Sequence, residues 1–144
     1  MKKLIIPLFF PAIALAAPVS VENAWVAATA PGQEEGAAYM ELSSREGATL
    51  IGAQSPAAKR VDVHAMSMRG GVMTMRRVDR VEIPPGGKVS LEPGKMHLML
   101  NEIAKPLAPG GSVPIRLTFE HQGRRYDVEV DARVMSMTHH MDMH

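Results

Sequence analysis

The residues best suited to chemistry gather in one short stretch around a glycine pair. The segment RVDVHAMSMRGGVMTMRRV, residues 60–78, contains one histidine and four methionines, which are His64, Met66, Met68, Met73 and Met75. Imidazole nitrogen and thioether sulfur are soft ligands, and in a chain without thiolates they select Cu(I) over zinc, magnesium or calcium. The chain has no cysteine. The stretch therefore indicates a Cu(I) site built from histidine and methionine.

The spacing around Gly70 and Gly71 predicts a β-hairpin. With a two-residue loop, Met68 pairs with Met73, Met66 with Met75 and His64 with Arg77. Because side chains alternate across a strand, one face carries Asp62, His64, Met66, Met68, Met73, Met75 and Arg77. This methionine face is expected to be partly open to water. The other face is expected to supply apolar surface to the core, and it carries Val61, Val63, Ala65, Val72, Thr74 and Val78.

Core filling is the usual role of a single methionine, because its side chain is flexible. That interpretation is weaker for the whole set, since β-branched residues on the opposite face already meet the need for burial. A second stretch, GKMHLMLNEI, repeats the pattern by placing His97 and Met99 on one strand face and Leu98 and Leu100 on the other. If the two strands approach each other, diagonal His64 and Met75 share one ion with His97 and Met99.

The surrounding chain predicts an all-β fold. Turn signals such as Pro84-Pro85-Gly86-Gly87 and Pro109-Gly110-Gly111 separate short runs with period-two alternation, such as SVPIRLTFE and RRYDVEVDARV. Regularly spaced short strands of this kind are typical of an antiparallel sandwich or barrel. One domain over residues 17–134 is expected, with no internal repeat or interdomain linker.

The amino-terminal residues 1–16 are predicted to be a cleaved signal peptide. Two lysines precede an apolar run that is too short to span a bilayer, and small residues follow at the cleavage position before Ala17. No later segment is long or apolar enough for a span, so none is expected after processing. Without Lys2 and Lys3 the chain keeps 14 basic against 15 acidic residues, a side-chain charge near −1. This balance gives no indication of a nucleic-acid partner.

The last ten residues, MSMTHHMDMH, are predicted to be a flexible tail over residues 135–144. Its histidines add nitrogen ligands, which can accommodate Cu(II). A weaker secondary metal site is therefore expected there, with Met66 of the hairpin as a reserve ligand of the core site. The tail ligands are His139, His140, Met141 and His144. A chain end without a specific role is the alternative.

The core ligands fit the pattern H-x10-M-x21-H-x-M, and this spacing resembles the PCuAC family of periplasmic copper chaperones. The segments ENAWVAATAPGQEEGAAYMELSS, VEIPPGGKVSLEPGKMHLML and VPIRLTFEHQGRRYDVEV also resemble that family. The resemblance implies a cupredoxin-like or immunoglobulin-like antiparallel β-sandwich in the periplasm that binds Cu(I) through His64, Met75, His97 and Met99. It also implies delivery to the CuA site of cytochrome c oxidase subunit II, alongside a Sco-type thioredoxin-fold protein.

Other functions fit the residues less well. An electron-transfer cupredoxin needs a cysteine thiolate beside its histidines, and an enzyme needs a nucleophile–base pair, which the sequence does not indicate. Two alternatives to a chaperone stay open. One is a periplasmic copper buffer or resistance protein with the same ligands. The other is a metal-free sandwich in which exposed methionines form a protein-binding patch.

Overall fold

The computed structural model describes residues 19–136, which form ten β-strands. The strands are β1 (Ser20–Ala27), β2 (Glu35–Ser44), β3 (Ala48–Gln54), β4 (Ala58–Arg69), β5 (Val72–Val78), β6 (Val81–Ile83), β7 (Gly87–Leu91), β8 (Met96–Ile103), β9 (Ser112–His121) and β10 (Arg124–Met135). A search of these residues for a helix long and apolar enough to cross a membrane finds none. The predicted signal peptide lies outside the described residues.

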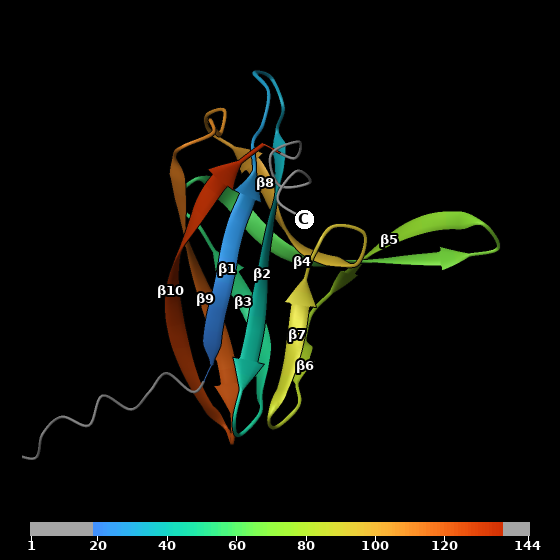
Figure 1. Ribbon diagram of the computed structural model, residues 1–144, viewed down its shortest axis with the longest axis vertical. Coiled ribbons are helices and arrows are strands. Elements are labelled where there is room, and N and C mark those ends of the chain that lie inside the picture. Colours follow the sequence, from blue (N-terminus) through green and yellow to red (C-terminus); the bar gives the residue numbers. More distant parts are fainter. Residues whose placement is uncertain (1–18, 137–144) are drawn as a thin grey trace, which may run out of the picture.

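The strands follow one another in the order β5-β4-β8-β2-β1-β10-β9-β3-β6, with β7 added to β2. An additional pairing between β3 and β4 brings the two ends of this path together. The predicted all-β sandwich is therefore confirmed (Figure 1). One of its pairings differs from the antiparallel expectation, because β1 and β10 run parallel. These strands come from opposite ends of the domain, so no short hairpin loop fixes their relative direction.

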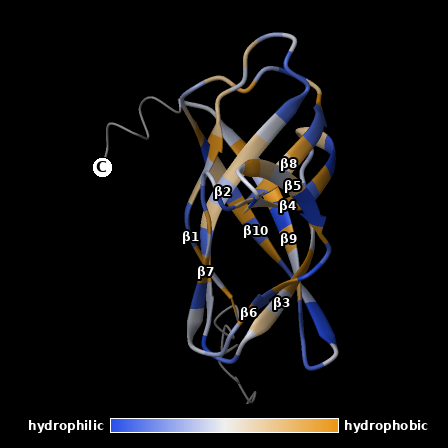
Figure 2. Cartoon of the chain, turned by 90° about the vertical axis from the view of Figure 1, so that its right-hand side faces the viewer, coloured by the Kyte–Doolittle hydropathy of each residue, from blue (hydrophilic) through white to orange (hydrophobic). Residues whose placement is uncertain are grey.

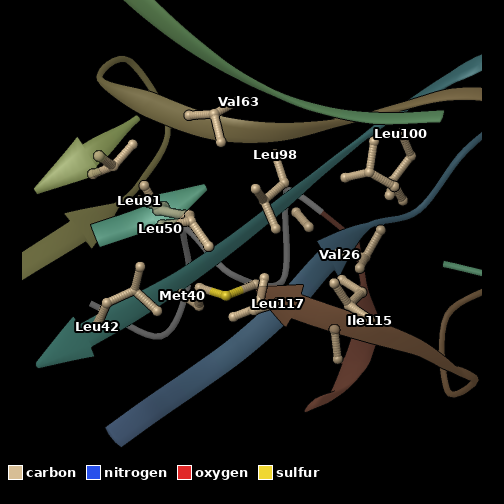
Figure 3. Packing of buried hydrophobic residues seen from close by; sticks show 14 of the residues in the cluster. Val26, Met40, Leu42, Leu50, Val63, Leu91, Leu98, Leu100, Ile115 and Leu117 are labelled. Atoms are coloured by element: carbon tan, nitrogen blue, oxygen red, sulfur yellow. The ribbon is translucent and has the colours of Figure 1, made fainter. Parts of the chain in front are cut away.

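The core lies inside the sandwich and is built from alternating strand positions. Leu98 and Leu100 of β8 and Ile115 and Leu117 of β9 are fully buried, as is Val26 of β1. Figure 3 shows these side chains directed toward one another from different strands. Burying one such side chain stabilises the fold by about 1.5–3 kcal/mol relative to leaving it in water. Strong burial on the inner face fixes the register of β8, because a one-residue slip would turn both leucines out of the core and put His97 and Met99 into it.

The hairpin of β4 and β5 leaves the body of the sandwich and projects from it (Figure 1). The prediction that one face of this hairpin packs against the core is right only for the part of β4 next to the sandwich. Val61 and Val63 are buried, whereas Val72 is 61% exposed and Thr74 is also exposed. The reason is that β8 begins at Met96, so the outer part of the hairpin has no third strand or second layer within residues 19–136 to pack on. Burial there ends where the neighbouring strand ends.

Candidate metal centre

The turn at Gly70 and Gly71 sets the register of the methionine face. Both glycines have positive φ angles, 58° and 80°, which a two-residue type I′ loop requires and side chains disfavour. The resulting pairs are Met68 with Met73, Met66 with Met75, and His64 with Arg77. The pairing predicted for this hairpin is confirmed. Met66 and Met75 therefore lie beside His64 on the same face.

Strand β8 pairs with β4 on the side away from β5, and this pairing brings the second His-x-Met segment to the first. His64 lies directly opposite His97, and Asp62 lies opposite Met99. The centroids of the two imidazole rings are 5.9 Å apart, with the ring planes tilted by 32°. Directly opposite residues of an antiparallel pair share a face. The register thus places the sequence-predicted ligands on three adjacent strands, β5, β4 and β8. Figure 2 shows these three strands beside one another.

His64 occupies the centre of this arrangement. His97 is its direct neighbour on β8, Met99 is diagonal to it on β8, and Met75 is diagonal to it on β5. Diagonal neighbours lie about 7–8 Å apart, within reach of long side chains that converge on one ion. Met66 is also well placed, because it follows His64 by two residues and lies diagonal to His97. By register Met66 is nearer than Met75 to His97, which strengthens its role as a reserve ligand.

Burial increases from the hairpin tip toward the sandwich. Met68 is 67% exposed and Met75 is 49% exposed, whereas His97 is only 5% exposed. The expectation that the methionine face of the hairpin is partly open to water is therefore right. His97 is more enclosed because β8 lies between β4 and β2 in the sheet. A metal ion held at both histidines would lie at the boundary between solvent and protein.

The surroundings of the two histidine side chains fit metal ligands. Burial, and then the neighbouring His64, lower the pKa of His97, so its imidazole stays neutral at ordinary pH. The Nδ1 atom of His64 is buried and has no hydrogen-bond partner among the described residues. Buried polar atoms are nearly always paired, and an unpaired one requires an explanation. A coordinated cation would satisfy this nitrogen, so the donor set fits a soft metal ion.

A hydrogen-bonded carboxylate borders the site on the side of Met99. The Asp62 side chain is only 11% exposed, and its Oδ2 accepts hydrogen bonds from Arg60 Nε at 3.0 Å and Asn101 Nδ2 at 3.1 Å. Arg77 Nε lies 3.8 Å from Asp62 Oδ1. Two guanidinium groups thus balance this carboxylate. The side chains flanking the ligands are held by these contacts, and such supporting contacts orient metal ligands.

Sequence reasoning missed two aromatic residues that extend the site along the sheet. The ring of Tyr39 on β2 lies 6.2 Å from that of His97, and the ring of Trp25 on β1 lies 4.6 Å from that of Tyr39. A β-bulge in β1, with Asn23 at a φ of 54°, shifts the register before Trp25 and sets its pairing with Tyr39. Neither aromatic is near His97 in sequence, so only the pairing of β8 with β2 places them beside it.

The structure brings together His64, Met66, Met75, His97 and Met99, and it leaves the tail untested. The secondary ligands predicted there, His139, His140, Met141 and His144, lie outside the described residues. Strand β10 continues to Met135, the first residue of the predicted tail, and Ala28 N donates a hydrogen bond to Met135 O at 2.9 Å.

Solved structures with this fold include copper proteins. The copper-bound PCuAC domain from PmoF2 has a TM-score of 0.67 and 27% identity to this chain, over 83% of this chain and 93% of that one. The Cu(I) form of DR1885 from Deinococcus radiodurans has a TM-score of 0.62 and 34% identity, over 88% and 84% of the two chains. The fold is that of PCuAC domains, and the resemblance found in the sequence is confirmed.

Residues 19–134 match the sequence family described as "Putative lipoprotein LpqE-like", and the chain belongs to this family. A relative named "Putative lipoprotein Lxx21020", from Leifsonia xyli subsp. xyli, is 30% identical over 102 residues. The aligned region covers 70% of this chain. It spans 61% of the relative's length.

Proposed function

We propose that this chain is a periplasmic Cu(I)-binding metallochaperone and not an enzyme. It binds one Cu(I) ion in the core domain through His64, Met75, His97 and Met99 and delivers it to the CuA site of cytochrome c oxidase subunit II. A Sco-type thioredoxin-fold protein acts alongside it. Copper is the cargo of this protein, so the site must bind it tightly and also release it.

The single observation that carries the proposal is the direct pairing of His64 with His97 between methionine-bearing strands. The two imidazoles face each other at 5.9 Å, and one of them has a buried nitrogen without a partner among the described residues. Imidazole nitrogens and thioethers match the preference of Cu(I) for soft ligands. The methionine side chain has no titratable proton and cannot form a disulfide, so such a site suits an oxidising compartment.

The relatives support the copper assignment and export. One solved neighbour is a copper-bound PCuAC domain, and another is a Cu(I)-loaded protein. The name of the sequence family and of one relative describes a lipoprotein. Together with the apolar amino-terminal run after Lys2 and Lys3, these names support export to the periplasm.

A periplasmic copper buffer is the second candidate, and the exposed thioethers favour it. Met68 and Met73 lie outside the four-ligand set and remain open to solvent. A protein that stores copper benefits from extra ligands, whereas a protein that delivers one ion does not need them. Transfer to an acceptor separates the two functions.

The decisive experiment mixes the Cu(I)-loaded chain with the apo soluble domain of cytochrome c oxidase subunit II and then separates the two proteins. We expect copper to leave the chain for the acceptor. Retention on the chain, with an acceptor that still takes Cu(I) from a weak chelate, would favour the buffer. A prior Cu(I) titration with His64→Ala/His97→Ala tests the site. His121→Ala is the matched control, since His121 lies on β9 outside the site. Absence of Cu(I) binding by the intact chain would favour the metal-free module.

A further inference from the structure

We propose that the outer part of the projecting hairpin binds a second Cu(I) ion through thioethers alone. The ligands of this outer site are Met66, Met68 and Met73. It lies next to the site of His64, His97, Met99 and Met75, hereafter the inner site. The inference rests on the proposed Cu(I) binding and extends it to residues outside the four-ligand set.

Met68 and Met73 lie outside the hydrophobic core of the described residues. Met68 is 67% exposed and Met73 is 49% exposed. Met66 N donates a hydrogen bond at 2.7 Å to Lys95 O, the residue just before β8, and the last residue of β4 paired with β8 is Ala65. Beyond Met66 the hairpin is a two-stranded ribbon. Core filling therefore cannot account for these side chains.

The register places the three sulfur-bearing side chains close together. Met68 and Met73 are directly paired, and Met66 lies two residues from Met68 on the same face. The Arg69–Val72 pair closes the turn, and Met66 N points away from β5 toward the side of β8. The pairs Met68–Met73 and Met66–Met75 therefore exchange no backbone hydrogen bonds across the hairpin, which makes them non-hydrogen-bonded pairs. Side chains approach most closely at such positions. Their Cβ atoms lie about 4.5–5.5 Å apart across the strands, so flexible thioethers can converge on one ion.

The opposite face of the ribbon is built to hold this geometry. Ser67 Oγ and Thr74 Oγ1 lie 3.0 Å apart in a hydrogen bond located between the two methionine pairs. This contact links β4 to β5 at the step between Met66 and Met68. The ribbon is therefore fixed at the point where the three sulfurs must meet.

The ligand chemistry defines the ion. The stretch from Val63 to Val78 contains no aspartate or glutamate, so ions that prefer oxygen ligands gain nothing there. The guanidinium of Arg77, which shares the methionine face, is engaged by Asp79 at 3.4 Å and by Asp62 at 3.8 Å. Thioethers favour a soft monovalent cation such as Cu(I), and they bind it without releasing a proton. The outer site should therefore work unchanged in mild acid.

The test uses the full-length protein with ¹³C-labelled methionine methyl groups and ¹⁵N-labelled histidines, titrated with Cu(I) without oxygen and separately with Ag(I). We expect two site-resolved events. The first moves the signals of His64, His97 and Met99. The second moves those of Met68 and Met73, and it persists at pH 5.5. Methyl signals identify each methionine, so binding to the tail is seen separately.

A matched pair of variants tests the assignment. Met68→Leu/Met73→Leu should lose one equivalent of Cu(I) from the hairpin and retain the first event. Val72→Leu/Arg76→Leu places two leucines at exposed positions on the opposite face of the same ribbon, leaves the Ser67–Thr74 contact intact and should retain both events. If the histidine signals move but those of Met68 and Met73 never do, or move only in step with the histidines, the outer site is wrong while the proposed function survives. If no histidine signal moves, the proposed function fails; hairpin methyl shifts without histidine shifts would still support the outer site.

Discussion

His64 and His97 face each other across the β4–β8 pairing, with their imidazole centroids 5.9 Å apart. They are 33 residues apart in sequence. One ring lies on a strand that continues into an exposed hairpin, and the other is buried in the sandwich. The pair therefore connects the stable body of the domain to the element that reaches into solvent. A metal ion bound between them would be anchored from one side and accessible from the other.

The proposed Cu(I) affinity should depend on pH through the histidines. A histidine must be neutral to bind metal, and methionine has no proton to exchange. We expect affinity to be flat above neutrality and to fall in acid, approaching about two decades per pH unit when both imidazoles are protonated in the apo protein. His97→Met should reduce the limiting slope to about one decade per pH unit. Competition with a chromophoric chelator from pH 5 to 8, corrected for chelator protonation, measures the Cu(I) affinity and its slope with pH. A wild-type affinity independent of pH would exclude both histidines as ligands.

The stability of the apo protein should fall in mild acid because of His97. Its pKa is lowered in the folded state by burial and by His64, so the unfolded chain binds a proton that the native protein resists. The contribution of neutral His97 is fully present above about pH 6.5, the ordinary histidine value. It decreases as the pH falls from there toward the folded pKa, by at most about 1.4 kcal/mol per pH unit.

Urea unfolding of apo wild type and of His97→Gln, each at pH 7.5 and 5.5, measures this effect. Glutamine keeps a polar side chain of similar size and does not titrate. The loss of unfolding free energy on acidification should be smaller in the variant. Equal losses in the two proteins would mean that His97 does not resist protonation in the fold.

Adjacent residues of β8 should behave in opposite ways. Leu98 is fully buried on the inner face, so Leu98→Ala should lower the free energy of unfolding by about 2–5 kcal/mol. Met99 lies on the ligand face and is only partly buried, so Met99→Ala should cost much less stability. It should weaken Cu(I) binding by roughly tenfold or more, since even supporting residues of metal sites contribute that much. For each variant, chemical denaturation gives the free energy of unfolding and chelator competition gives the Cu(I) affinity. Unfolding of Met99→Ala would favour the core-filling interpretation.

Met66 should replace Met75 at the inner site when Met75 is removed, and it then no longer serves the outer site. They are directly paired, and each lies within reach of His64. Met75→Leu alone should weaken Cu(I) binding, and Met66→Leu/Met75→Leu should weaken it by more than the product of the two single effects. Affinities of the four proteins form a double-mutant cycle. Strict additivity would show that Met66 never replaces Met75.

The carboxy-terminal residues should supply a separate and weaker copper event, including Cu(II), through His139, His140, Met141 and His144. Truncation after Ser136 keeps β10 intact, because Met135 still accepts the hydrogen bond from Ala28 N. The shortened chain should lose the Cu(II) event and keep the Cu(I) site. Calorimetric titration of both chains with Cu(II) measures the difference, and unchanged stoichiometry would contradict a tail site.

The sequence by itself determined the local structure of the hairpin. The glycine pair fixed the turn, and alternation then fixed which residues share a face with His64. Alternation also separated Leu98 from His97 and Met99 on β8. These features are local, because a strand has a period of two and a tight turn leaves one register. The all-β class followed from the same repeated pattern.

Only the tertiary structure decided which strands meet. The pairing of β8 with β4 brings His97 to His64, and the pairing of β8 with β2 adds Tyr39, which no spacing in the sequence indicated. The exposure of Val72 was likewise misjudged, because alternation says which face a residue occupies and not whether another layer covers that face. Strand order and burial depend on contacts between distant segments. The packing of the whole core selects them.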